Sequence, residues 1–153
     1  MDINYEKSFA LGDKTEKHFA TLLLDKGWTD ITITGGMFSE YDISAIKDFR
    51  EVKFEIKSSS AVLEYKHHFV EYYQSDLPSG MQLTTADWQV YYGNDHKIYY
   101  IRTEELDRYI KESGKELKPT KYKTKSGLVS ALGYTVHKDI FNAPIEHNLT
   151  IKQ

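Results

Sequence analysis

The sequence predicts an α/β fold in which a central mixed β-sheet is flanked by helices. Residues 13–26 repeat their apolar side chains at helical spacing, whereas residues 51–57 alternate strictly between charged and apolar side chains, as a strand does. Turn signals, such as the run Gly93-Asn94-Asp95, separate further strand-like segments. Because helical and extended segments follow one another along the chain, helices packed on the faces of one sheet are the expected arrangement.

The first helix is expected at residues 13–26. Asp13 is a candidate N-cap, Phe19 lies on the apolar face, and Gly27 can adopt the left-handed conformation that ends a helix. Glu16 shares the face of Phe19. Its carboxylate either points toward the sheet or closes a capping box with Asp13, and the sequence leaves both interpretations open.

The remaining elements are predicted from alternation and turn chemistry. Strands are expected at 31–34, 41–46, 51–57, 67–74, 88–92 and 97–101. The turn at residues 47–50 joins the second and third of these strands into a hairpin. Thr103 is expected to cap a further helix, which Gly114 ends.

The chain is predicted to form one domain, residues 1–153, because this length can bury one core. Residues 115–127 carry several lysines with Pro119 and Gly127, and this lysine-rich segment is interpreted as a loop. The apolar residues within 128–141 are expected to return to the core.

The composition also restricts the compartment and the chemistry. The chain contains no cysteine, which excludes disulfides, thiol catalysis and a cysteine zinc site. No apolar run reaches membrane-spanning length, and residues 1–6 lack the basic and apolar pattern of a signal peptide. A cytoplasmic protein without a membrane partner is therefore expected.

The formal net charge of −3 gives nucleic acid no general attraction, so any affinity for DNA must come from local groups. Lysines are concentrated in the segment from residue 111 to residue 125. Those predicted to contact DNA phosphates are Lys118, Lys121, Lys123 and Lys125.

The predicted hairpin brings two carboxylates and a lysine together. Asp42 lies in its first strand, and Glu55 and Lys57 share one face of its second strand. Mg²⁺ prefers one or two protein carboxylates together with water and phosphate oxygens, and the Ile56 carbonyl can supply a further oxygen. The alternative is a solvated face with cross-strand ion pairs, since residues 51–53 repeat the same acid-x-lysine spacing.

Asp42, Glu55 and Lys57, with Glu16 on the preceding helix, resemble the catalytic motif of the PD-(D/E)XK nuclease superfamily, although Tyr41 stands where that motif has its proline. The resemblance implies a restriction-endonuclease-like core. It also implies that Asp42, Glu55, Lys57 and Glu16 are catalytic. The carboxylates of Asp42 and Glu55 are expected to bind Mg²⁺, for which Mn²⁺ can substitute.

The segments 68–72 and 78–88 are similar to small phage-encoded members of the superfamily. This similarity implies that Glu71 is a further metal ligand, and Gln74 is a candidate phosphate contact. Ser79 offers a hydroxyl to a phosphate as well. The alternatives are an exposed strand charge for Glu71 and an ordinary turn at Ser79.

The function implied is that of a Mg²⁺-dependent DNA endonuclease acting on branched or structured DNA in phage recombination, repair or DNA processing. A phage-encoded enzyme of this kind, similar to Holliday junction resolvases, would act in the host cytoplasm. Two symmetric cuts need two active sites, so a homodimer is expected. The alternative is a catalytically inactive nucleic-acid-binding protein that keeps the nuclease fold.

Overall fold

The computed structural model describes residues 3–4, 13–34, 40–114, 116, 118–124 and 127–151. Its helices are α1 (Asp13–Asp25), α2 (Val62–Tyr65) and α3 (Thr103–Ser113), with 3-10 turns η1 (Gly80–Gln82) and η2 (Lys138–Ile140). None of the helices described is long and apolar enough to cross a membrane. The strands are β1 (Ile3–Asn4), β2 (Thr29–Ile33), β3 (Ile43–Lys47), β4 (Arg50–Ser59), β5 (His67–Gln74), β6 (Leu77–Pro78), β7 (Trp88–Gly93), β8 (Lys97–Arg102), β9 (Lys118–Thr124), β10 (Gly127–His137) and β11 (Ile145–Glu146).

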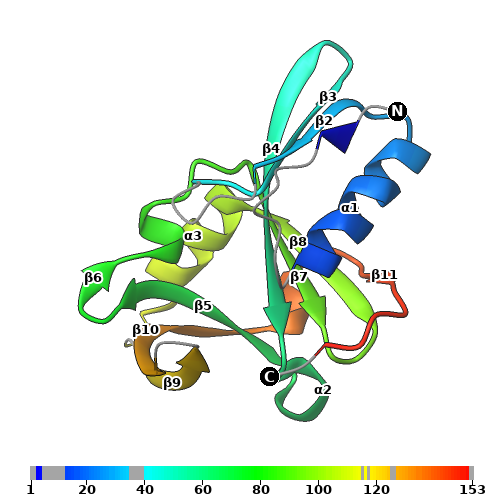
Figure 1. Ribbon diagram of the computed structural model, residues 1–153. Coiled ribbons are helices and arrows are strands. Elements are labelled where there is room, and N and C mark those ends of the chain that lie inside the picture. The colour runs from blue at the N-terminus through cyan, green and yellow to red at the C-terminus, as the bar shows by residue number, and fades with distance from the viewer. Residues whose placement is uncertain are drawn as a thin grey trace.

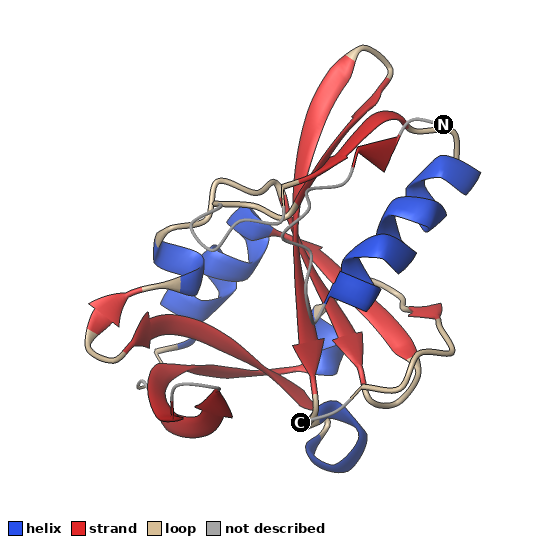
Figure 2. Ribbon diagram, viewed as in Figure 1, coloured by secondary structure: helices blue, strands red, loops and turns tan. Residues whose placement is uncertain are grey.

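The described strands form two sheets. The large sheet has seven strands in the order β1-β2-β3-β4-β7-β8-β11, and the small sheet has four in the order β6-β5-β10-β9. The large sheet is mixed, because β4 pairs in parallel with β7 and in antiparallel orientation with β3. α1 lies on one side of β4, and α3 lies with the small sheet on the other (Figure 1, Figure 2). The predicted α/β class, with a central mixed sheet flanked by helices, is confirmed.

β4 separates two hydrophobic cores. Phe54 belongs to the first core, where its ring centroid lies 5.2 Å from that of Phe19 on α1. Tyr91 on the neighbouring strand β7 belongs to the second core, which α3 and the small sheet complete. Side chains alternate along a strand, and Lys57 pairs in register with Tyr91, so Glu55 and Lys57 face the second core.

The hairpin of β3 and β4 has the predicted turn. Lys47 pairs with Arg50, and Asp48 and Phe49 form the two residues between them. Their φ angles are 53° and 64°, the left-handed values that a type I′ turn requires. The end of this hairpin projects from the body of the protein (Figure 1).

The prediction of a loop at residues 115–127 is wrong for most of that segment. The backbone of residues 118–124 forms β9, which pairs with β10 at the edge of the small sheet. The prediction rested on lysines and Pro119, yet both residue types are common on edge strands. Parts of the segment lie outside the described residues, namely 115, 117, 125 and 126. The segment 128–141 returns to the core as expected, with buried side chains at Ala131, Val136 and Phe141.

The expected helix ends are only partly right. Gly27 and Gly114 follow α1 and α3 with φ angles of 90° and 67°, as predicted. Thr103 does not cap α3, because it is already the first helical residue and Arg102 occupies the N-cap position. The Thr103 hydroxyl instead accepts a hydrogen bond of 3.0 Å from the buried amide of Gln89.

His68 of β5 is fully buried within the second core. Its ring centroid lies 5.1, 4.6 and 4.8 Å from those of Tyr91, Tyr99 and Phe141, and its Nδ1 lies 2.7 Å from the Ser59 hydroxyl. No hydrogen-bond partner for Nε2 is present in the part of the chain that the structure describes. Burial lowers the pKa of His68 to about 3, so the ring is uncharged at neutral pH.

We expect His68 to make the fold sensitive to acid. Its folded pKa is lower than its unfolded pKa, so protonation favours the unfolded state once the pH falls below the unfolded value. This residue should lower stability by up to about 1.4 kcal/mol per pH unit between about pH 6 and pH 3. Urea unfolding of the wild type and of a His68→Phe, Ser59→Ala double variant measures the difference. Parallel profiles of stability against pH would contradict the prediction.

Candidate active site

Asp42 lies directly before β3 and is partly buried. Its Oδ2 accepts a hydrogen bond of 2.7 Å from the backbone N–H of Ile56, and its own backbone N–H donates to the Phe54 carbonyl at 2.9 Å. These bonds extend the pairing between β3 and β4 by one residue. The Asp42 carboxylate is thereby fixed to the strand that carries Glu55 and Lys57.

Glu55 and Lys57 form an ion pair on β4, with 3.3 Å between Lys57 Nζ and Glu55 Oε2. The Glu55 side chain is 9% exposed, whereas the Lys57 side chain is 43% exposed. A buried carboxylate therefore lies beside a lysine that solvent can reach. The ion pair therefore lies at the boundary of the second core, where a charged ligand can approach Lys57.

Burial and neighbouring charges shift the pKa values of Asp42 and Lys57. Burial raises the pKa of Asp42, and the Glu55 charge raises it further, although the Ile56 N–H and the Lys57 charge lower it. Burial alone would lower the pKa of Lys57, but the charges of Glu55, Asp42 and Glu71 outweigh burial and raise it. Lys57 is therefore protonated at neutral pH. Asp42, Glu55, Lys57 and Glu71 are called the carboxylate–lysine cluster below.

Glu71 enters the cluster from β5 and is held by the turn that follows β6. Its Oε2 accepts a hydrogen bond of 2.9 Å from the hydroxyl of Ser79, which is buried. Gly80 packs so closely that a Cβ there would collide with the Glu71 carbonyl oxygen, and its φ of 52° also favours glycine. Ser79 therefore orients Glu71, and its contact with a phosphate stays a prediction.

The contacts within the carboxylate–lysine cluster do not test four further predictions. Glu16 lies on α1, and Phe19 of the same helix packs against the face of β4 opposite to Glu55 and Lys57. The charges that shift the pKa values of Asp42 and Lys57 come from residues other than Glu16. Gln74 lies at the end of β5, where it pairs with Leu77. The catalytic role of Glu16, the phosphate contact of Gln74 and metal binding by the Ile56 carbonyl and by Glu71 stay predictions.

Three of the four lysines predicted to bind phosphate lie on the small sheet. Lys118, Lys121 and Lys123 are on the backbone of β9, the strand at the edge of that sheet. Lys125 lies outside the described residues. Their contacts with DNA stay predictions.

The competing acid-x-lysine run at residues 51–53 has a different environment. Glu51 is exposed, and Lys53 Nζ lies 4.8 Å from the centre of the Tyr41 ring. The backbone N–H of Lys53 donates to Asp87 Oδ2 at 2.8 Å, and the N–H of Asp87 donates to the Lys53 carbonyl at 2.8 Å. This part of β4 is a structural connection to the start of β7.

Tyr91 is a residue of the site that sequence reasoning missed. It pairs in register with Lys57 and is buried. Burial raises the pKa of Tyr91, and the charges of Glu55 and Glu71 raise it further, so a neutral hydroxyl lies close to the cluster. No local signal could have found it, because its position depends on the pairing of two strands that are distant in the sequence.

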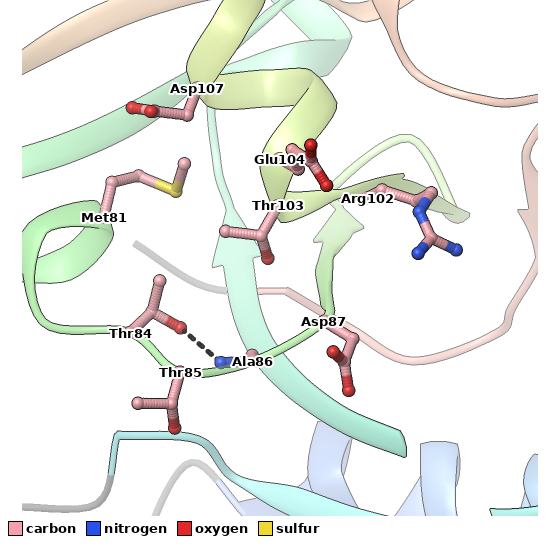
Figure 3. A pocket seen from close by; sticks show the side chains of 9 residues that line it. All are labelled: Met81, Thr84, Thr85, Ala86, Asp87, Arg102, Thr103, Glu104 and Asp107. Atoms are coloured by element: carbon pink, nitrogen blue, oxygen red, sulfur yellow. Dashed lines mark hydrogen bonds between the residues drawn. The ribbon is translucent and has the colours of Figure 1, made fainter. Parts of the chain in front are cut away.

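A separate pocket of about 310 Å³ lies between the loop at residues 84–87, η1 and the start of α3 (Figure 3). Its lining includes the acidic residues Asp87, Glu104 and Asp107 and one cation, Arg102. It contains no member of the carboxylate–lysine cluster, and its acidic lining disfavours phosphate. The cluster is therefore the better candidate for chemistry on a phosphate ester.

The donor set at the cluster fits a hard divalent cation. Within the described residues, no group of three or more histidine, aspartate or glutamate side chains is arranged to enclose a metal. Mg²⁺ does not need such a group, since it takes one or two carboxylates and completes its shell with water and phosphate. The raised pKa of Asp42 indicates that Lys57 and the Ile56 N–H compensate its charge incompletely. A cation held by Asp42 and Glu55 would supply the missing charge.

Comparisons with known proteins do not assign a family. No protein-family model matches the chain, and the search of curated proteins found no match. Among solved structures, a bacterial homing endonuclease, I-Ssp6803I, superposes with a TM-score of 0.48 and 18% sequence identity. The match covers 61% of this chain and 67% of that chain.

We expect Asp42→Asn to raise the melting temperature in EDTA by a few degrees. The folded state raises the pKa of Asp42, so ionisation at neutral pH opposes folding. Asparagine removes the charge and keeps an oxygen for the Ile56 N–H. The gain should shrink as the pH falls through the raised pKa of the folded state, and it should disappear below about pH 4, where the wild-type carboxyl is protonated in both states. Scanning calorimetry across this pH range measures the effect.

Glu55→Gln is the matched control, because it removes the carboxylate 3.3 Å from Lys57 and should not stabilise the protein. The opposite ranking, with a higher melting temperature for Glu55→Gln than for Asp42→Asn, would place the uncompensated charge on Glu55.

Proposed function

We propose that this protein is a metal-dependent nuclease that hydrolyses phosphodiester bonds in DNA, with a site of the PD-(D/E)XK type. The observation that carries the proposal is the cluster on one hairpin. Asp42 is fixed to the Ile56 N–H at 2.7 Å, and the Glu55–Lys57 pair lies one residue to either side of Ile56. Phosphodiester hydrolysis needs a reactive water and compensation of the charge on the phosphoryl oxygens, and these groups are suited to both tasks.

Each residue of the cluster has a proposed role. Asp42 and Glu55 hold Mg²⁺, or Mn²⁺ as a substitute, and the Ile56 carbonyl adds an oxygen. The bound cation supplies Lewis acidity and lowers the pKa of a water. Lys57 is protonated at neutral pH, so it donates a hydrogen bond to the attacking water or to a phosphoryl oxygen. Glu71, oriented by Ser79, holds the Lys57 ammonium in place.

The proposed substrate is duplex or branched DNA, as in phage recombination or repair. Lysines of β9 and the neighbouring Lys125 contact its phosphates, and Gln74 adds a polar contact. A homodimer would place one such site at each of the two strands of the DNA.

We expect cleavage to depend on an added divalent cation, because the proposed ligands are carboxylates. Labelled linear, closed-circular and four-way DNA are incubated with the protein in Mg²⁺, Mn²⁺ or excess EDTA. Cleavage of closed circles with Mg²⁺ or Mn²⁺ alone is the expected result. Full cleavage in EDTA would overturn the proposal, and DNA binding without cleavage in any metal would identify a binding protein that lacks catalysis.

We expect Lys57→Ala to lower kcat by about a hundredfold or more, as the loss of a group that stabilises developing charge does. Lys53→Ala is the matched control on the same strand and should retain nearly full activity, since Lys53 lies over the Tyr41 ring. Single-turnover cleavage of both variants measures the difference. If Lys53 were the essential lysine, residues 51–53 would be the motif.

A further inference from the structure

Phe49 combines two unusual features at the tip of the β3–β4 hairpin. Its side chain is completely exposed, at 102% of the reference area, and its φ is 64°. This position of a two-residue turn favours glycine, because a positive φ strains a residue with a bulky side chain. A single exposed apolar residue needs no explanation by itself. A fully exposed aromatic residue at a strained position contributes nothing to folding, so it calls for a function outside the folded chain.

The tip is accessible from both sides of the hairpin. β2 pairs with β3 only as far as Ile46, and β7 pairs with β4 only from Phe54 onward. Residues 47–51 are all exposed. The hairpin therefore extends beyond its neighbours in the large sheet and carries Phe49 at its end (Figure 1).

The residues next to Phe49 indicate the partner. Lys47 and Arg50 form the cross-strand pair that flanks the turn, and both are exposed. Asp48 lies between them, and the exposed Glu51 follows Arg50 on β4. In the folded chain Lys47 Nζ lies 5.5 Å from the centre of the Trp28 ring. If they turn toward a DNA duplex, Lys47 and Arg50 can meet phosphates while the Phe49 ring enters between bases. A purely apolar partner surface would leave both cations without a counter-charge.

The number of residues between Phe49 and Glu55 gives the distance along β4 from the tip to the candidate active site. Glu55 follows Phe49 by six residues on the same strand. At about 3.3 Å per residue this is about 20 Å along β4. About six base-pair steps of 3.4 Å cover the same length. A duplex lying along the hairpin would contact the tip and the carboxylate–lysine cluster together.

We propose that Phe49 is a wedge that inserts between base pairs of duplex DNA, about six steps from the phosphate at the cluster. This inference rests on the proposed nuclease function. Insertion of an apolar side chain unstacks the neighbouring bases and kinks the duplex. The wedge therefore favours DNA that opens at low cost, such as a junction, a mismatch or a flexible pyrimidine–purine step.

The test uses duplexes that carry 2-aminopurine at successive positions, since this base fluoresces more strongly when it is unstacked. Binding is measured by anisotropy with Ca²⁺ in place of Mg²⁺, and cleavage is measured separately in Mg²⁺. The central variant is Phe49→Gly, which relieves the strain at φ 64° and should be at least as stable as the wild type. Phe49→Trp restores a large aromatic ring. Leu77→Ala is the control for an exposed apolar side chain elsewhere, because Leu77 is 68% exposed on β6.

The expected result is a rise in fluorescence at one step for the wild type and Phe49→Trp. Phe49→Gly should lose this rise and bind about tenfold more weakly, whereas Leu77→Ala should match the wild type. If Phe49→Gly matches the wild type in DNA affinity and in fluorescence, and both cut DNA, the wedge is overturned. The proposed nuclease function is then unaffected. A wild type that neither binds nor cuts DNA would overturn both. A dimer that Phe49→Gly converts to a monomer without a change in DNA affinity would assign the tip to a second copy of the chain.

Discussion

Both the fold and the candidate site depend on how β4 divides its side chains between two environments. Phe54 enters the core beneath α1, and Glu55 beside it turns to the opposite face, where it is almost completely buried. A buried carboxylate strongly destabilises a folded protein unless a charge or a donor compensates it. Lys57, two residues further on the same face, provides this compensation. The strand can bury a charged face because its own sequence supplies both members of the ion pair.

The carboxylate–lysine cluster also connects the two sheets. Asp42, Glu55 and Lys57 belong to the large sheet, whereas Glu71 acts on Lys57 from β5 of the small sheet. A shift of the small sheet would change the distance between these charges and with it the proton affinity of Lys57. The apolar contacts of the second core, which fix β5 against β7 and α3, therefore determine the electrostatics of the site as well as the stability of the fold.

Local features could be predicted from the sequence, and long-range pairings could not. The β3–β4 hairpin and the helix ends at Gly27 and Gly114 depend on signals within a few residues. Asp42, Glu55 and Lys57 were predictable as a group for the same reason. Tyr91 lies beside Lys57 only because β4 pairs with β7, which is distant in the sequence. The strand at 118–124 likewise forms by pairing with another strand, β10. Lysine and proline content alone therefore favoured a loop where pairing with β10 forms an edge strand.

The turn after β6 has a consequence for how related chains can be recognised. Gly80 lies against the backbone of Glu71, and Ser79 beside it donates to the Glu71 carboxylate. Any other residue at position 80 would push the turn away and release that carboxylate from its hydroxyl partner. A Ser-Gly pair at this distance from a strand glutamate is thus a sequence signature of the arrangement. It would distinguish distant homologues that retain the oriented glutamate from those that share only the hairpin.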